Sequence, residues 1–460
     1  MSLNNKQSVP VKPSVSPRPR KKIKTKDSGI PWIGEIPANW EVRKLKQMVE
    51  FPVEKAKENT PYIGLENIVG FTAKYIETNG VYDLSQALSC IPQDVLFGKL
   101  RPYLGKAYIV EKPSCCSGEF VIFRNAPNSK FLLFTILSDG FIEFVNASTY
   151  GAKMPRANPD FIRNMSVPVP PAGTQKRIAE FLDKKCAEID ALIALQEKMI
   201  TELKSYKQSV ITEAVTRGVP ANIKTSHRDA ETQSVPVKPS VHPRSREKIK
   251  MKDSGIPWLG SIPAHWEVRK IKMLGILQGG NGFPEEFQGN FESEIPFIKV
   301  KSLAENPILK VGKDTISEEI RLTLKTIVIP RNSIVFAKVG AALLLQRFRK
   351  LDFSTCIDNN MMAFIPSEKI LPDFFIYASS LFDFSLFVNP GTIPSVNQEQ
   401  VGNIFIPFPD INIQKEIVDF LDSKTEEIDS MISLKQQKIS TLQNYKKSVI
   451  FEYVTGKNEA

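Results

Sequence analysis

The chain has 460 residues, and its 61 Lys and Arg against 50 Asp and Glu give a formal net charge of +11. At ~100 to 200 residues per domain this length predicts about two to four domains, and a content of 42% hydrophobic and 24% charged residues is ordinary for a globular protein. The composition excludes a chain that is disordered throughout, and the positive charge suggests nucleic acid as a partner.

Cysteine usage and the apolar runs indicate where such a protein works. The five cysteines are an odd number without a CxxC pair, so neither a disulfide scaffold nor a zinc site is expected. The start, MSLNNKQSVPVKP, lacks the apolar core of a signal peptide. The longest apolar run, at 131–145, is interrupted by acidic residues and is shorter than the ~18 residues of a membrane span. We therefore expect a cytoplasmic protein.

The sequence repeats itself. Residues 7–46 return at 233–272 with 32 of 40 positions identical, and residues 175–216 return at 414–455 with 22 of 42 identical. The segments between these blocks have the size of domains and share little sequence. This order predicts one frame that carries two related but differently adapted modules. A solenoid is excluded, because its repeat would be ~20 to 50 residues long.

Both variable modules are predicted to mix α and β structure. Their strands are expected in apolar runs of about four to eight residues that are bounded by turn residues. Helices are expected near 131–145 in the first module and near 371–387 in the second. The predicted strands lie at 62–69, 107–111, 119–124 and 164–171 in the first module and at 296–300, 326–330, 333–339, 361–366 and 403–409 in the second.

The longer repeated blocks each predict a helix of about 40 residues, ~60 Å long at ~1.5 Å per residue. Apolar residues recur at alternating steps of four and three, which is the seam spacing of a coiled coil. Gly218 and Gly456 follow the blocks as stop signals, and the seam also contains Lys207 and Lys446. The apolar residues expected to pack between the helices are Leu182, Ile189, Ile193, Ile200, Leu203 and Val210 in the first and Leu421, Ile428, Ile432, Ile439, Leu442 and Val449 in the second.

Two interpretations of these helices remain open. They pair with each other and do nothing more, or they form an antiparallel pair that sets the spacing of the modules and offers a face to a partner. Their predicted length exceeds one turn of DNA, ~34 to 36 Å. The expected organisation is a basic Pro-rich leader at 1–29, a module at 30–174, a helix at 175–218, a basic linker at 219–255, a module at 256–413 and a helix at 414–456.

Several motifs together resemble a known family. The runs PWIGEIPANWEVRKLK, GKLRPYLGK, GAKMPRANPDFIRNMSVPVPP and QKRIAEFLDKKCAEIDALI, all but the second repeated in similar form, are similar to the DNA-specificity subunit of type I restriction-modification systems. The resemblance covers about residues 30–456 and implies an α+β fold with two target-recognition domains, separated by two long helices that form an antiparallel coiled coil. Each domain would read one half of a bipartite DNA site. The duplicated leader is not part of the family pattern.

The resemblance also implies a non-catalytic subunit with partners. Two methyltransferase subunits would dock on it and transfer methyl from S-adenosylmethionine to adenine N6, and restriction subunits would add translocation and cleavage that use ATP and Mg. This chain is expected to bind none of these cofactors and no metal. The residues agree, because the Gly-Lys pairs lack the Ser or Thr of a Walker A loop, and the Asn-Pro-Pro-aromatic motif of adenine methyltransferases and a GxGxxG run are absent from the sequence.

DNA contact is expected where Lys, Arg, amide and hydroxyl side chains gather in loops. Sequence reading needs hydrogen-bonding groups at base edges, while Lys and Arg hold the phosphates. A single surface Lys or Arg is more often merely solvated, so clusters count for more. The candidates are Lys99, Arg101, Tyr103, Lys106, Lys153, Arg156 and Asn158 in the first module and Lys299, Lys301, Lys338, Arg347, Arg349, Thr392, Ser395, Asn397 and Gln398 in the second.

The net charge does not decide between the possible functions. Residues 12–26 carry seven Lys or Arg and no acid, and residues 238–252 carry six against one Glu, so the rest of the chain is close to neutral. These two arms suit sequence-blind attraction to phosphates or simple solvation. The alternative to a specificity subunit is a coiled-coil scaffold whose modules bind proteins without reading DNA. A self-contained nuclease or methyltransferase is disfavoured by the missing motifs.

Overall fold

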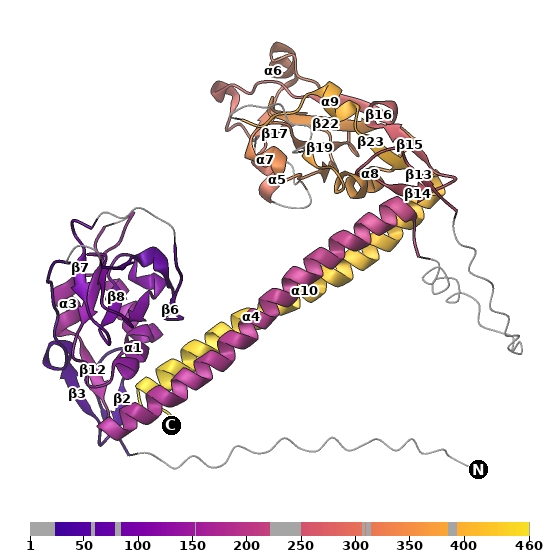
Figure 1. Ribbon diagram of the computed structural model, residues 1–460. Coiled ribbons are helices and arrows are strands. Elements are labelled where there is room, and N and C mark those ends of the chain that lie inside the picture. Colours follow the sequence, from indigo (N-terminus) through magenta and orange to yellow (C-terminus); the bar gives the residue numbers. More distant parts are fainter. Residues whose placement is uncertain are drawn as a thin grey trace, which may run out of the picture. The chain divides into compact units, whose positions relative to one another are not determined.

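The computed structural model describes residues 24–56, 60–78, 84–151, 153–220, 250–305, 309, 314–384 and 393–459. Most of the expected leader and linker lies outside the described residues. The chain falls into two compact units, one that runs to Glu197 and resumes at Gln436, and one that spans Lys198–Lys435. Each unit contains one globular head and part of both long helices, α4 (Ala172–Arg217) and α10 (Ile411–Val454), which are drawn in magenta and yellow in Figure 1.

The first head comprises the described residues before α4. It consists of short strands and turns, followed by three helices and a final strand. Its elements are β1 (Thr25–Asp27), β2 (Glu35–Pro37), β3 (Glu41–Lys44), η1 (Leu45–Gln47), β4 (Tyr62–Ile63), η2 (Leu65–Asn67), β5 (Ile68–Val69), β6 (Lys74–Tyr75), β7 (Leu88–Cys90), β8 (Val95–Gly98), η3 (Pro102–Leu104), β9 (Ala107–Ile109), β10 (Ser114–Cys116), β11 (Phe120–Phe123), α1 (Ser129–Leu137), α2 (Asp139–Ala147), α3 (Pro159–Asn164) and β12 (Ser166–Val169).

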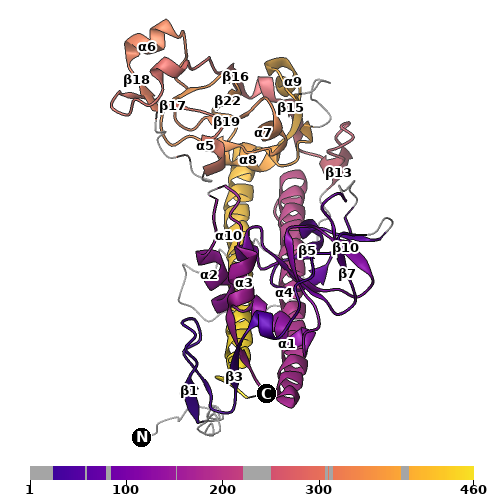
Figure 2. The same ribbon diagram turned by 90° about the vertical axis from the view of Figure 1, so that its left-hand side faces the viewer.

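Two small sheets form the core of the first head. In one, β8 pairs antiparallel with β9 and β11, and in the other β10 pairs parallel with β4 and antiparallel with β7. Buried side chains of α1 and α2, among them Ile136 and Phe141, pack on Phe97 and Phe123 of the first sheet. Figure 2 shows β7 and β10 on the side of the head away from α2 and α3.

The second head comprises the described residues between α4 and α10. It has longer strands and more short helices than the first head. Its elements are β13 (Met251–Asp253), β14 (Ser261–Pro263), β15 (Glu267–Lys270), η4 (Ile271–Met273), β16 (Gly275–Gly279), η5 (Glu285–Phe287), β17 (Ile295–Ile298), α5 (Ser302–Glu305), β18 (Asp314–Ile316), α6 (Glu318–Thr323), β19 (Ile334–Ala337), α7 (Ala341–Leu344), β20 (Arg349–Lys350), β21 (Cys356–Ile357), β22 (Met361–Pro366), α8 (Pro372–Ser379), α9 (Gln398–Gly402) and β23 (Phe405–Phe408).

The two heads share their central pairings although their sequences differ. An antiparallel pair lies at the centre of each, β8 with β11 in the first head and β19 with β22 in the second. A parallel pair lies beside it, β4 with β10 in the first and β17 with β21 in the second. The predicted mixture of α and β structure and the internal repeat are therefore confirmed.

The repeated blocks build the junction between each head and its helix. The identical sequence EVRK forms β3 and β15, which pair antiparallel with β12 and β23, the strands just before α4 and α10. Gln175 and Gln414, both buried, donate their side-chain amides at 2.9 Å to the carbonyls of Pro170 and Pro409. Because a buried amide must find partners, these bonds fix the direction in which each helix leaves its head.

The C-terminal end of each helix is covered by a tryptophan of the short repeated block. In the first unit, Gly456 follows α10 at φ +72°, and a Cβ there would lie 2.3 Å from Pro37 and 3.1 Å from Trp40. In the second unit, Gly218 follows α4 at φ +86°, where a Cβ would lie 3.5 Å from Trp266. The left-handed backbone and the close approach explain why glycine ends both helices.

The two helices are antiparallel in both units. In the first, the rings of Phe181 and Tyr453 stack with centroids 4.4 Å apart, and Lys446 Nζ lies 2.8 Å from Asp190 Oδ1. In the second, Lys207 Nζ lies 2.6 Å from Asp429 Oδ2. Rising numbers in α4 thus meet falling numbers in α10, which confirms the antiparallel coiled coil. The two seam lysines, which the apolar pattern left unexplained, form equivalent ion pairs between the helices.

The apolar seam residues lie between the helices as their spacing requires. The buried ones are Leu182, Ile189, Ile200, Leu421, Ile428, Ile439 and Val449, and the half-buried ones are Ile193, Leu203, Val210, Ile432 and Leu442. A two-helix pair by itself covers its seam incompletely. Where a head lies against the helices it adds Phe131, Trp266 and other apolar side chains.

Two of the predicted strands are wrong. The run 62–69 is divided into β4, η2 and β5, because buried Asn67 accepts a hydrogen bond from the Gly64 amide at 2.7 Å and donates to the Ile76 carbonyl, which bends the chain. The run 326–330 forms only an isolated bridge between Ile329 and Thr355. The helix expected near 131–145 consists of α1 and α2, and 385–387 of the other expected helix lie outside the described residues.

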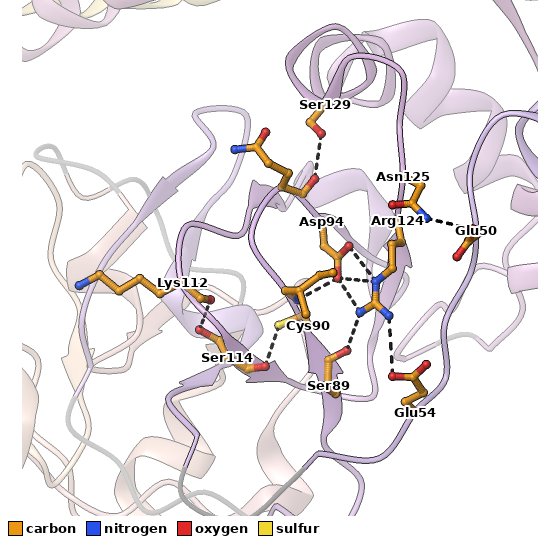
Figure 3. Close-up of polar contacts among 12 residues, drawn as sticks. Glu50, Glu54, Ser89, Cys90, Asp94, Lys112, Ser114, Arg124, Asn125 and Ser129 are labelled. Carbon is orange, nitrogen blue, oxygen red and sulfur yellow. Dashed lines mark hydrogen bonds and ion pairs between the residues drawn. The ribbon is translucent and has the colours of Figure 1, made fainter.

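A buried ion pair ties the two sheets of the first head together (Figure 3). Arg124, which follows β11, donates from Nη2 to Asp94 Oδ2 at 2.9 Å and from Nε to Oδ1 at 3.1 Å, and Asp94 is only 1% exposed. Arg124 Nη2 also donates to the carbonyl of Ser89 in β7 at 3.4 Å. Hydrogen bonding to Asp94 raises the pKa of Arg124, so the guanidinium stays charged. The pair thus has a structural role.

Candidate nucleic-acid interface

Two loops that are distant in sequence meet beyond the end of β8 in the first head. The Ala157 amide donates to the Lys99 carbonyl at 2.9 Å, and the Arg101 amide donates to the Pro155 carbonyl at 2.7 Å. Leu100 and Arg156 form an antiparallel bridge between these contacts. The structure thus brings together the candidate clusters at 99–106 and 153–158, which the sequence predicted separately.

The second head builds the same arrangement beyond the end of β19. The Val396 amide donates to the Lys338 carbonyl at 2.9 Å, and the Gly340 amide donates to the Pro394 carbonyl at 2.8 Å. Val339 bridges Ser395. Every one of these residues is offset by 239 from its counterpart in the first head, the offset that also relates the two helices. We call these arrangements the first loop pair (Lys99–Lys106 with Lys153–Asn158) and the second loop pair (Lys338–Leu345 with Ile393–Gln398).

An asparagine near the end of each loop pair caps the following helix. Asn158 Oδ1 accepts from the Asp160 amide at 2.9 Å at the start of α3, and Asn397 Oδ1 accepts from the Gln400 amide at 2.8 Å at the start of α9. Asparagine is among the preferred N-cap residues because its short side chain reaches the free amides of the first turn. Both residues are exposed beside the loop pair.

The charged side chains of the first loop pair differ in how firmly they are held. Arg156 makes a bidentate ion pair with Glu119, with donor to acceptor distances of 2.8 and 3.1 Å, and this hydrogen bonding raises its pKa. Lys106 donates its ammonium to the Leu65 carbonyl at 2.5 Å. Arg101 is exposed and makes one long contact, 3.4 Å, to the Lys153 carbonyl.

The candidate DNA-binding residues of the second head also differ in how firmly their side chains are held. Lys299 is held by Asp314 at 2.8 Å, and burial lowers the pKa of Arg349. Lys338 lies beside β16, where a Cβ on Gly279 would be 3.4 Å from its Nζ, and Gln398 donates to the Leu277 carbonyl at 3.2 Å. Lys338 and Gln398 therefore lie together. Of the others, Lys301 is exposed, Arg347 is half-buried, and Thr392 lies outside the described residues.

The exposed apolar residues of the loop pairs were not among the residues predicted from the sequence. The pattern that could have indicated them is a large apolar side chain beside Gly or Pro in a basic loop. Such groups suit contact with thymine methyl groups in the major groove. In the first loop pair and just before its second loop they are Leu104, Tyr150 and Met154, 38%, 62% and 50% exposed, and in the second they are Leu344, Leu345 and Ile393, 50%, 57% and 64% exposed.

Arg101 holds a backbone conformation that suits glycine. Its φ is +49°, in the left-handed region, and its counterpart Gly340 has φ +77°. Both residues are the N-cap of a short helix, η3 in the first head and α7 in the second. An arginine held in a strained conformation on an exposed loop points to a functional role for its side chain.

In the part of the chain that the structure describes, no three His, Cys, Asp or Glu side chains are grouped so as to hold a metal ion. The described helices also include none with the length and apolar content needed to cross a membrane. The loop pairs therefore remain the candidate site for contact with nucleic acid.

Comparison with known proteins agrees with this geometry. The model of the type I restriction modification DNA specificity domain matches the chain twice, at residues 37–205 and 263–444. The chain belongs to this family. It is 22% identical to the type I restriction enzyme MjaIX specificity subunit of Methanocaldococcus jannaschii, over 92% of this chain and 94% of that protein. It is 23% identical to the type I restriction enzyme EcoBI specificity subunit of Escherichia coli, over 69% and 63% of the two chains.

A solved structure shares the fold. A chain from a structure described as the basis of complex assembly and conformational transition of the type I R-M system covers 92% of this chain and 99% of its own length, with a TM-score of 0.69 at 16% identity. Each match of the specificity domain contains one loop pair and reaches into one long helix. The function of the chain is therefore DNA sequence specificity in a type I restriction-modification system.

Proposed function

We propose that this specificity subunit reads a bipartite DNA site, one half with each loop pair. The observation that carries the proposal is that the same backbone arrangement occurs twice, at one offset, with different side chains. The first loop pair exposes Arg101, a side chain that suits guanine, where the second has Gly340. The second exposes Gln398, which suits adenine, at the position of Pro159 in the first head. Two loop pairs with different chemistry fit two different half-sites.

The catalytic steps belong to partner subunits in this proposal. Methyltransferase subunits supply S-adenosylmethionine chemistry at adenine N6, restriction subunits supply ATP- and Mg-dependent translocation and cleavage, and the chain itself is non-catalytic. All of these subunits work in the cytoplasm, where the DNA is. The chain contributes the choice of site and the surface on which the partners assemble.

Two matching apolar patches on the helices are the proposed docking sites for methyltransferase subunits. In the first unit, Leu192, Leu195 and Tyr445 are 46%, 50% and 49% exposed. They come directly before Ile193, Gln196 and Lys446, which continue the seam spacing of four and three, so they share one flank of the helix pair. Their counterparts in the second unit at offset 239 are Met431, Leu434 and Tyr206, 41%, 65% and 51% exposed. Two equivalent patches suit two copies of one partner.

The function is tested by expressing the chain with methyltransferase subunits of its own genome and mapping N6-methyladenine across the host DNA. We expect methylation at one bipartite motif that disappears when this chain is omitted. Methylation that does not depend on the chain would contradict the proposal. So would binding of the assembled complex that is equally strong on duplexes with and without the motif.

Replacing one exposed leucine of each patch by aspartate tests the docking sites. We expect Leu195→Asp and Leu434→Asp each to reduce the complex from two methyltransferase subunits to one, and the double variant to bind neither. A charge at the centre of an apolar contact weakens binding by about 2 kcal/mol or more. Native mass spectrometry of the co-expressed subunits gives the stoichiometry.

A matched control lies three residues from Leu195 on an outward-facing part of the helix. The side chain of Lys198 is 74% exposed, and Lys198→Asp changes the charge by more than Leu195→Asp does. We expect Lys198→Asp to keep both partner subunits. Loss of partners from this variant as well would mean that helix charge, rather than the apolar patch, controls assembly.

A further inference from the structure

Phe71 in the first head is held by two lysines of α10. Lys446 donates its ammonium to the Phe71 carbonyl at 3.2 Å and to Asp190 Oδ1 at 2.8 Å, so it links the head to both helices. The ammonium of Lys447 lies 4.8 Å from the centroid of the Phe71 ring, within the range of a cation–π contact. Lys446 is only 7% exposed, and its contacts are therefore shielded from water.

Phe71 in turn supports the turn that carries Arg101. Its amide donates to the Gly105 carbonyl at 2.8 Å. A Cβ on Gly105 would lie 2.9 Å from three atoms of the Phe71 ring, so the Gly105 backbone lies directly against the ring. On its other side the turn runs through η3, where Tyr103 is 46% exposed. Movement of Phe71 would therefore move the exposed side chains of the first loop pair.

The segment around Phe71 packs on the apolar core of the first head through the side chains of Phe71 and Ala73, but its backbone is strained and it borders a cavity. Phe71 and Ala73 have φ values of +61° and +55°, which non-glycine residues adopt only when their surroundings hold them. Behind the segment lies a cavity of about 320 Å³, lined by Phe71, Thr72, Ala73 and Lys74 and by residues of α1, α4 and α10. A strained segment that borders a cavity is packed on only part of its surface, so the contacts from Lys446 and Lys447 help to hold it in place.

The second unit contains the same ion pair in a more open setting. Lys207 and Asp429 are the counterparts of Lys446 and Asp190 at offset 239. The Lys207 side chain is 28% exposed against 9% for Lys446. Its hydrogen bonds to described residues go to Asp429 alone. The ion pair is thus common to both units, whereas the bond to the carbonyl of a head is described only for Lys446.

We infer that Lys446 and Lys447 are positioning residues for DNA reading: by holding Phe71 they fix the Arg101–Gly105 turn against the first half-site. This inference rests on the proposed reading of DNA by the loop pairs. It assigns to the helix pair a part in base selection at one half-site, in addition to carrying the heads and the partner subunits. The lysines touch no base and act only through Phe71.

The test uses the complex with methyltransferase subunits and compares two matched double variants. Lys446→Met with Asp190→Asn removes the ion pair and the bond to Phe71, while Lys207→Met with Asp429→Asn removes the equivalent ion pair, which holds all the hydrogen bonds that Lys207 makes to described residues. Binding is measured on the cognate duplex and on two sets of duplexes with single-base changes in one or the other half-site. The half-site at which an Arg101 variant loses discrimination against base changes is the one that belongs to the first head.

For the Lys446 variant we expect about tenfold weaker discrimination against base changes in that half-site and unchanged discrimination in the other, because a misplaced side chain loses about one specific contact. The Lys207 variant should discriminate like the wild type at both half-sites. Phe71→Leu, which leaves the ion pair intact, should reproduce the Lys446 effect, and Lys446→Arg, which keeps a cationic donor, should restore most of the discrimination.

Several outcomes would overturn the inference. Equal loss of discrimination at both half-sites, or the same loss in the Lys446 and Lys207 variants, would mean that the ion pairs only stabilise the helices. Wild-type discrimination in both the Lys446 and Phe71→Leu variants would separate the lysines from base selection. If the wild-type complex itself fails to discriminate among the duplexes, the proposed function fails, and this result is distinct from a failure of the positioning role.

Discussion

Replacing Arg101 by glycine is expected to leave the first unit at least as stable as before and to weaken binding to DNA about 10- to 100-fold. The stability follows from the backbone, because φ at Arg101 is +49° and the counterpart in the second head is already a glycine at φ +77°. The affinity falls because an exposed guanidinium that pairs with guanine or phosphate is lost. Scanning calorimetry and fluorescence anisotropy with a labelled duplex measure the two effects.

Gly340→Ala in the second head calibrates the backbone contribution. A Cβ at Gly340 meets no atom within 4 Å, so the change adds only the strain of a left-handed residue. We expect it to lower the stability of the second unit by about 1 kcal/mol. Two results would contradict the role given to Arg101. Arg101→Gly would destabilise the first unit as a side-chain deletion does, or it would leave DNA binding unchanged.

Removing the buried carboxylate of Asp94 is expected to destabilise the first unit by about 3 to 5 kcal/mol, because Asp94→Ala strands the Arg124 guanidinium inside the head. The second unit should keep its stability, since it contains neither residue. Hydrogen exchange resolved by peptide separates the two units. We expect faster exchange in β7, β8 and β11 and unchanged exchange in β19 and β22.

An exposed ion pair of the second head provides the matched control. Lys350 and Asp373 are 2.7 Å apart, with side chains 39% and 41% exposed, so Asp373→Ala should change stability by less than about 1 kcal/mol. Replacing both buried partners, as in Asp94→Leu with Arg124→Met, should recover much of the loss because no charge is left unpaired. Equal losses of stability in Asp94→Ala and Asp373→Ala would show that the buried ion pair contributes no more to stability than the exposed one.

The frame of this protein could be predicted from the sequence because it is regular. A seam with alternating steps of four and three is typical of a helix that packs in a coiled coil, and the repeat of that seam at offset 239 indicated a second helix of the same kind. The role of Lys207 and Lys446 could not be predicted from the seam pattern. Their partners, Asp429 and Asp190, lie on the other helix, and the antiparallel register is needed to bring them together.

The recognition loops could be predicted only in part. The clusters around Arg101 and Arg156 were identified by composition, but their meeting depends on hydrogen bonds between Lys99 and Ala157, 58 residues apart. The division between exposed Arg101 and the anchored Lys106 was not visible either, since both are basic residues in one short loop. Such predictions are limited by the large separation in sequence between residues that contact each other, rather than by residue type.

Closure of the first unit by a segment that is made after the second unit has a consequence for biosynthesis. Gly456 covers Trp40 and Pro37, and Lys446 pairs with Asp190, so the first unit is complete only when the segment from Gln436 to Gly456 has left the ribosome. The second unit is continuous in sequence and needs none of this segment. Domains usually fold in the order of their synthesis. Here the unit that emerges first is expected to finish last, and the apolar surface that α10 covers in it stays open to chaperones until residues 436–456 have been made.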